Sequence, residues 1–338
     1  MQAGRKYSLY QTLYWSRKYI LAFILIDSIP VIAFQIFDIK WLILPWQPIS
    51  LIGIAVSFYL GFKNNSSYER LWEARKIWGG IVNESRTLTV KVRDFITSRH
   101  ADISDEELKK IHKEIVHRHV AWLKAFTYQM REPREWEHHN KRYDKQRWDG
   151  DVHHETDHFE KIKPYLSEED YNYISKKGNK ASHLLSLQSK TFNELRDKNL
   201  IDDFRHIDLE NQIGKLYTLQ GKSERIKNFP FPRQYASMNQ FFVWIFILLL
   251  PFGMMNVFDE YLDYHYNWLT IPFTVLVSWV FIMMEMTGEY SENPFEGLYN
   301  DVPISAIARS TEIDIRQMLE EEDLPPEIKP VTSYKILY

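Results

Sequence analysis

Histidines and carboxylates gather in one short stretch of the chain, where together they could bind a divalent metal ion. The histidines of this stretch are His138, His139, His153, His154 and His158. The acidic residues among them are Asp149, Asp151, Glu155 and Asp157. No HExxH or other defined metal-binding spacing occurs, and the chain has no cysteine. We therefore favour a solvated polar loop and keep a metal site as the alternative.

Asp27 is a second residue that could do chemistry, because it lies inside the apolar stretch Tyr19–Phe37. An ionisable residue within a membrane span is a candidate functional group. A structural role is the alternative, since Pro30 lies one turn away and frees backbone groups that a carboxylate can bond. The sequence contains no Gly-rich phosphate loop, G-x-S-x-G or HExxH motif. We therefore predict that the protein is not an enzyme.

A line of bulky apolar side chains is the third candidate feature. Ile54, Phe58 and Phe62 recur at i, i+4 and i+8, which places them on one line of a helix. Such a line can face lipid, pack against a partner helix, or narrow a pore whose conductance depends on wetting. Small residues beside the line would allow helices to approach closely. They are Gly53, Ala55, Ser57 and Gly61.

Long apolar segments must position these residues. The chain has 338 residues, a net charge of −3 and a mean hydropathy of −0.39, so its composition gives no bias toward nucleic acid. A bilayer core about 30 Å thick needs about 20 apolar helical residues. Four stretches approach or reach that length, which predicts a multi-pass membrane protein. They are Tyr19–Phe37, Trp41–Phe62, Phe241–Phe258 and Trp268–Met284.

The distribution of basic residues predicts the topology. Lysines and arginines precede the first and third spans and follow the second, whereas the short connections between paired spans are mainly acidic. By the positive-inside rule, both termini and the long middle region are cytoplasmic. We therefore divide the chain into 1–62 with two spans, 63–240 as a cytoplasmic helical region, 241–286 with two spans, and a cytoplasmic segment 287–338. The His-rich insert is placed at about 131–163.

The middle region is predicted to be helical almost throughout. The pattern after Ser66 continues the second span, and Ser104-x-x-Glu107 is a capping box that opens a further helix. Ser167-x-x-Asp170 marks another helix start, before the stretch that extends to Leu195. After the fourth span we expect an amphipathic helix from about Ile304, followed by an acidic, proline-rich tail.

The stretch ISLIGIAVSFYLGFKNNSSYERLWEARKIWGG resembles the second-span signature of the bestrophin family in its bacterial form. The matching marks are Gly61–Phe62 and the R-x-W motif at Arg70–Trp72. FPFPRQYA before the third span and ENPF at Glu292–Phe295 resemble further motifs of that family, in the same order. The resemblance covers roughly residues 5–320.

The resemblance implies an all-α homopentamer around one central ion pore. Ile54, Phe58 and Phe62 match the hydrophobic neck of the family, and a second constriction at the cytoplasmic exit matches Ile201, with Leu200 as its neighbouring alternative. Animal members conduct chloride and other anions and are opened by calcium, whereas some bacterial members favour monovalent cations. Of the calcium-ligand positions, only Asn293 and Asp301 are matched here. Calcium prefers six to eight oxygen ligands, so this departure argues against calcium gating.

We therefore predict a passive channel for monovalent ions in the inner membrane of a bacterium, with no cofactor. The resemblance implies chloride as the conducted ion, and a cation-selective channel of the same fold is the alternative. Arg70 and Arg75 could face the water-filled vestibule and favour anions; equally, they could pair with Glu69 or Glu73. A membrane regulator that senses a metal or ligand through the His-rich insert is the hypothesis from a different class.

Overall fold

The computed structural model describes the chain except residues 5, 100, 139–158, 262–263, 332–334 and 338. Regular structure in the described residues is helical, apart from two isolated bridges that Ile336 makes with Gln2 and Val331. The predicted all-α class is thus confirmed. The chain forms two compact units. The apolar unit comprises Gly4–Arg70 and Pro230–Asn293, and the amphipathic unit comprises Met1–Ala3, Leu71–Phe229 and Pro294–Tyr338.

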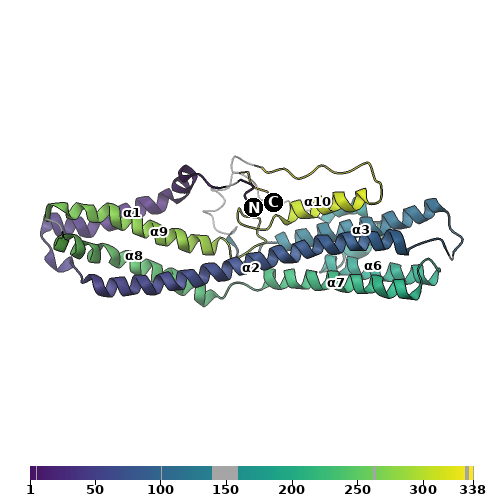
Figure 1. Cartoon of the computed structure of the whole chain (residues 1–338), viewed down its shortest axis with the longest axis horizontal. Coiled ribbons are helices and arrows are strands. Elements are labelled where there is room, and N and C mark those ends of the chain that lie inside the picture. Colours follow the sequence, from purple (N-terminus) through teal and green to yellow (C-terminus); the bar gives the residue numbers. More distant parts are fainter. Residues whose placement is uncertain (5, 100, 139–158, 262–263, 332–334, 338) are drawn as a thin grey trace. The chain divides into compact units, whose positions relative to one another are not determined.

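Four long helices contribute to the apolar unit. They are α1 (Leu9–Phe37), the first part of α2 (Trp46–Phe95), α8 (Arg233–Tyr261) and α9 (Thr270–Glu289). The 3-10 turns η1 (Lys40–Leu42) and η4 (Tyr264–Leu269) lie in the connections within each helix pair. Helix α1 packs against α8 and α9, which also pack against each other (Figure 1). Pro30 and Pro251 lie inside α1 and α8, and both helices continue through them.

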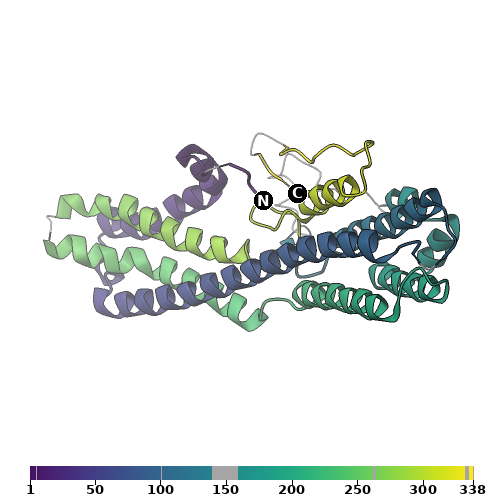
Figure 2. The same cartoon turned by 45° about the vertical axis from the view of Figure 1, so that its right-hand side comes forward.

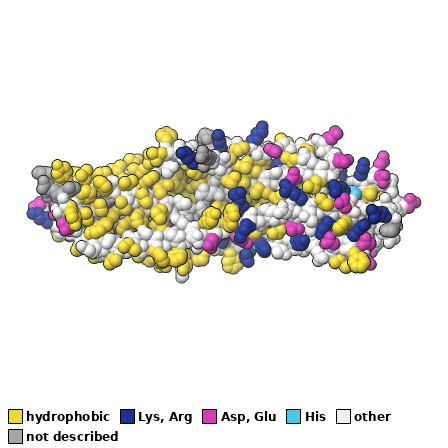
Figure 3. Space-filling view, in the orientation of Figure 1, with side chains coloured by type: hydrophobic (Ala, Val, Ile, Leu, Met, Phe, Trp, Pro, Cys, Tyr) yellow, Lys and Arg dark blue, Asp and Glu magenta, His cyan; other side chains and the backbone are white. Residues whose placement is uncertain are grey.

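The apolar unit has the length and the surface of a membrane-spanning structure. Four segments are long and apolar enough to cross a bilayer, and each contains one predicted span. They are Leu9–Phe37, Lys40–Phe95, Arg233–Tyr261 and Tyr266–Glu289. Hydrophobic side chains cover most of the visible face of α1, α8 and α9, whereas Lys, Arg, Asp and Glu side chains cover much of the amphipathic unit (Figure 3). Contiguous apolar surface of this extent is normal for lipid contact and rare on soluble proteins.

The amphipathic unit is built around α3, which contacts α6, α7, α10 and η3 (Figure 2). The second part of α2, from Leu71, also belongs to this unit. The other helices of the unit, in chain order, are α3 (Asp105–Arg131), η3 (Phe159–Tyr165), α5 (Glu168–Ser175), α6 (Lys180–Asp197), α7 (Asp203–Asn228) and α10 (Ile304–Gln317). Aromatic rings form the centre of its core. Phe126 stacks between Trp78 and Trp122, with ring centroids 5.5 and 5.7 Å apart and interplanar angles of 6° and 9°.

Local capping determines where several of these helices begin. The predicted capping box is confirmed: Ser104 Oγ accepts from the Glu107 amide at 3.2 Å, and the Glu107 carboxylate accepts from the Ser104 amide at 3.3 Å. The predicted helix start at Ser167 is confirmed, because Ser167 Oγ accepts from the Asp170 amide at 3.1 Å; the helix it opens, α5, ends at Ser175, and α6 begins at Lys180. Asn179 starts the new helix by accepting from the Ser182 amide at 3.0 Å.

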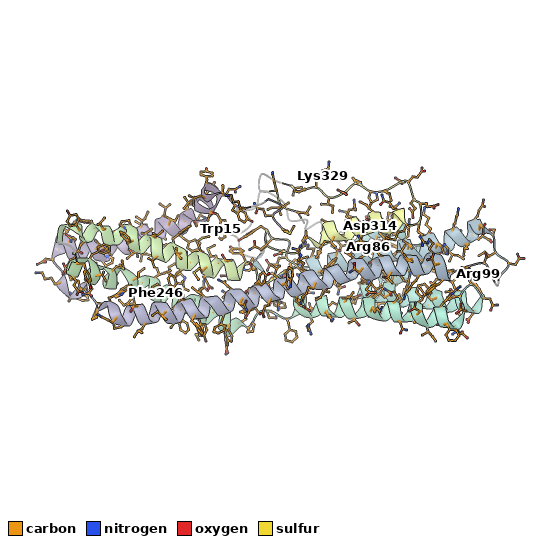
Figure 4. All side chains as sticks on the ribbon, in the orientation of Figure 1. Trp15, Arg86, Arg99, Phe246, Asp314 and Lys329 are labelled. Carbon is orange, nitrogen blue, oxygen red and sulfur yellow. The ribbon has the colours of Figure 1, made fainter. Side chains whose placement is uncertain are left out.

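Helix α10 is fixed in the amphipathic unit by charged groups. Arg86 of α2 pairs with Asp314 of α10, and the two side chains point toward each other (Figure 4). Glu312 is buried; it accepts a hydrogen bond from the Tyr165 hydroxyl at 2.5 Å and forms an ion pair with Lys124, whose Nζ lies 2.8 Å from the other carboxylate oxygen. A buried carboxylate with several donors is held in one geometry, so α10 has little freedom to slide along α3.

Replacing Trp78 by Ala should destabilise the protein strongly, because Trp78 is fully buried and stacked on Phe126. A large aromatic residue truncated in a packed core costs about 3–5 kcal/mol. Thermal unfolding of the detergent-solubilised protein measures the loss. Trp72→Ala is the matched control on the same helix, since Trp72 is 47% exposed and should shift the unfolding temperature far less. Equal shifts for both variants would contradict this description of the core.

Candidate functional site

The predicted neck residues Ile54, Phe58 and Phe62 lie on the open side of α2 within the apolar unit. Their side chains are 67%, 68% and 56% exposed, and the rings of Phe58 and Phe62 meet edge to face with centroids 4.7 Å apart. The opposite side of the helix is buried, since Val56 and Leu60 are at most 2% exposed. The structure therefore brings the three residues together on one face, and that face is not covered by the helices of its own unit.

Close contacts hold the buried side of α2 against its neighbours. A Cβ atom at Gly53 would lie 2.7 Å from Cε2 of Phe246 on α8, the residue labelled in Figure 4. At Gly253 of α8 a Cβ atom would lie 2.7 Å from Cδ1 of Ile49. Gly61, by contrast, has open space around it and lies on the exposed side. The small residues thus serve two purposes: some allow packing within the chain, and Gly61 leaves room for a further helix.

A buried ion pair follows the neck residues directly. Lys63 of α2 pairs with Glu285 of α9, and each side chain is only 2% exposed. Asn239 of α8 donates to the second oxygen of the same carboxylate. A Cβ atom at Gly288 would clash with Oδ1 of Asn64 and would lie 3.5 Å from Cγ of Lys63. Lys63 and Glu285, which we call the anchor pair, therefore join three helices at the end of the neck.

Three sequence motifs meet in a charged cluster of the apolar unit. Arg233 of FPFPRQYA lies 3.3 Å from Glu292 of ENPF, measured between guanidinium nitrogen and carboxylate oxygen. Arg70 of the R-x-W motif is partly buried, and its charge interacts with both of these residues. In the amphipathic unit, Arg75 is exposed and its guanidinium carbon lies 5.8 Å from the centroid of the Trp72 ring. That either arginine faces a vestibule stays a prediction.

The predicted aperture residues lie in the turn between α6 and α7. Leu200 and Ile201 are 4% and 3% exposed in the single chain and belong to the core of the amphipathic unit. The turn is fixed by Asn199, whose φ is +58°, and by a hydrogen bond from the Thr97 amide to the Leu200 carbonyl of 3.1 Å. Their role as a cytoplasmic constriction stays a prediction.

Asp301, a predicted weak calcium ligand, forms hydrogen bonds with backbone amides of the loop that precedes it. One carboxylate oxygen accepts from the amides of Gly297 at 2.6 Å and Leu298 at 2.9 Å, and Gly297 has a φ of +95°. Burial raises the pKa of the Asp301 carboxyl, and the Arg131 guanidinium opposes that shift. Asn293 is 6% exposed. Among the described residues, no group of three His, Cys, Asp or Glu side chains could hold a metal ion.

His138 overturns part of the solvated-loop prediction. Its side chain is 3% exposed, and Nδ1 lies 3.2 Å from both carboxylate oxygens of Glu296. The neighbouring Glu137 is also buried and pairs with Lys227 of α7. Burial raises the pKa of Glu137 and lowers that of Lys227, while each charge opposes the shift of the other. The other residues of the candidate metal site lie outside the described residues: His139, His153, His154, His158, Asp149, Asp151, Glu155 and Asp157.

Asp27 is fully buried in the apolar unit and faces Thr274 of α9. The Thr274 hydroxyl donates instead to the Thr270 carbonyl at 2.8 Å. Neither Asp27 oxygen has a hydrogen-bond partner among the described groups, so the structure does not show the expected bond to the backbone near Pro30.

Comparison with known proteins gives a consistent result. A family model described as "Bacterial/Fungal Bestrophin protein" matches residues 17–317. The "Voltage-dependent anion channel-forming protein YneE" of Escherichia coli (strain K12) is 26% identical over 289 residues, which cover 86% of this chain and 82% of that protein. A protein of Ralstonia nicotianae, also named as voltage-dependent and anion channel-forming, is 27% identical over 280 residues, covering 83% and 79%.

A solved structure of a bestrophin homologue is also similar to this chain. The crystal structure of a bacterial bestrophin homologue from Klebsiella pneumoniae aligns with a TM-score of 0.74 and 25% sequence identity. The alignment covers 92% of this chain and 99% of that chain. The chain therefore shares its fold with that structure.

Breaking the anchor pair on one side should destabilise the protein more than removing both charges. Lys63→Met leaves the Glu285 carboxylate buried and unpaired, which costs about 3–5 kcal/mol, whereas replacing a whole buried pair with apolar groups is often nearly neutral. In detergent, the unfolding temperature of Lys63→Met should be lower than that of the double variant Lys63→Met/Glu285→Leu.

Lys76→Met is the control for this ranking, because Lys76 is 59% exposed in its pair with Glu73. Exposed pairs contribute about 0–1 kcal/mol. A double variant less stable than Lys63→Met would show that the two charges do not act as a pair.

Proposed function

The chain belongs to the bacterial and fungal bestrophin family, and from that premise we propose that it is a passive channel that conducts anions, chloride among them, across a membrane. The relatives form channels and are not enzymes. Four apolar helices support its place in a membrane. A monovalent-cation channel of the same fold is the alternative function.

The observation that carries the proposal is the uncovered line of Ile54, Phe58 and Phe62 on α2. A soluble protein would bury such side chains, and a lipid-facing helix needs no particular alignment of them. We propose that copies of the chain, five by family resemblance, place this line around a common axis. Stacked apolar rings then form a narrow neck that gates by dewetting. The open space beside Gly61 supports close approach of a neighbouring copy.

Charge distribution supports the proposed orientation. Basic residues precede α1, follow the neck on α2 and precede the apolar part of α8, while Asp259 and Glu260 lie at the other end of α8. By the positive-inside rule, the amphipathic unit and both termini lie in the cytoplasm and the apolar unit spans the inner membrane. In this arrangement Leu200 or Ile201 forms the second constriction, and Arg70 and Arg75 lie near the vestibule.

Truncating the neck should raise ion flux. The triple variant Ile54→Ala, Phe58→Ala and Phe62→Ala widens and partly wets the constriction, so we expect several-fold faster chloride efflux from liposomes. The matched control is Phe241→Ala, Ile245→Ala and Leu248→Ala on α8, which removes comparable exposed apolar bulk from a helix outside the proposed pore. The control should conduct like the natural sequence.

The assembly is checked in the same samples by light scattering of the purified protein. If the triple variant forms a folded oligomer with unchanged flux, the assignment of these residues to a neck is contradicted. If no sample shows flux, the proposed channel function is contradicted. A reversal potential measured in a KCl gradient separates anion from cation conduction, which decides between the proposed function and its alternative.

A further inference from the structure

Glu69 is the first charged residue on the open face of α2 after the neck residues. It follows Phe62 by seven positions and Asn65 by four, and both Asn65 and Glu69 are exposed. At about 100° per residue, the two side chains lie within about 20° of the mean direction of the three neck side chains. The rise of an α-helix places Glu69 about 10 Å beyond Phe62 along the axis.

The basic residues nearest to the neck do not share this face. Lys63 and Arg70 point about 140° and 120° away from the mean direction of the neck side chains. The charge of Lys63 is paired with Glu285 in the buried anchor pair. Arg70 is partly buried, where its charge interacts with Glu292. The cations next to the neck in the sequence therefore contribute little positive potential to its open side.

The Glu69 carboxylate is held in position but keeps its charge available. The Asn65 side-chain amide donates to one of its oxygens at 2.9 Å. None of the ion pairs found among the described residues involves Glu69, although Glu73 on the next turn pairs with Lys76 at 2.9 Å. An exposed carboxylate that is oriented by an amide and forms no ion pair among the described residues acts as a fixed negative charge.

We propose that Glu69 forms a ring of carboxylates at the end of the neck that lowers the preference of the channel for anions over monovalent cations. This inference rests on the proposed function, because only copies of α2 around one axis bring the carboxylates together. Rings of Asp or Glu concentrate cations and exclude anions, and a constricted, low-dielectric mouth strengthens the effect. The distance from Phe62 is comparable to the Debye length of about 10 Å at 0.1 M salt, so the effect should weaken at high salt.

The test is the reversal potential in planar bilayers under a KCl gradient, for the natural sequence, Glu69→Gln and Glu69→Lys. Gln has nearly the same shape as Glu, and its side-chain oxygen can still accept the hydrogen bond from the Asn65 amide, so the fold should persist. We expect a several-fold increase in the chloride-to-potassium permeability ratio for Glu69→Gln and a larger one for Glu69→Lys. Glu106→Gln, which removes an exposed carboxylate in the first turn of α3, should leave the ratio unchanged.

A second measurement needs no variant. The permeability ratio of the natural sequence should shift toward chloride as ionic strength increases, and Glu69→Gln should lose that dependence. If the natural sequence carries no current, the proposed channel function is overturned. If it conducts but Glu69→Gln has the same reversal potential as the natural sequence, at low salt and at high salt, the role of Glu69 is overturned while the channel function stands.

Discussion

The rotation of α2 about its own axis depends on the buried ion pair between Lys63 and Glu285. Two charges can remain in an apolar interior only when they are paired and their other hydrogen-bonding positions are satisfied, and Asn239 completes this requirement. Lys63 follows Phe62 directly, so the two side chains point to different sides of the helix. Turning α2 to bury Phe62 would pull Lys63 from its partner. The neck residues therefore stay on the open side.

Features set by local sequence could be predicted, and those set by distant partners could not. The spacing of Ile54, Phe58 and Phe62 defined one helix face, and Ser104 with Glu107 defined a helix start, because each pattern lies within a few residues. Lys63 and Glu285 are 222 positions apart, so nothing in either neighbourhood revealed the pair. His138 was misjudged for the same reason: its polar surroundings in sequence suggested solvent, while its partner Glu296 lies beyond the third and fourth apolar helices.

The basic residues beside the spans predicted an orientation in the membrane, but their number does not show where each side chain points. Lys63 and Arg70 are among the basic residues that follow the second span, yet each interacts with a carboxylate far away in the sequence: Lys63 with Glu285 and Arg70 with Glu292. Arg70, Arg233 and Glu292 come from three separate motifs that only the fold unites. These motifs, which lie far apart in the sequence, thus form one charged cluster in the apolar unit, where desolvated charges need partners.

An apolar neck opposes the entry of any ion, because cations and anions alike lose hydration in a constriction lined by Ile and Phe. In the proposed channel, fixed charges near the neck that face the open side would then bias which sign of ion passes. Since the anchor pair turns Lys63 away and the Glu292 cluster draws Arg70 aside, the nearest charge left on that face is the Glu69 carboxylate. The interaction that exposes the neck residues is therefore also the one that determines which charge an ion meets beside them.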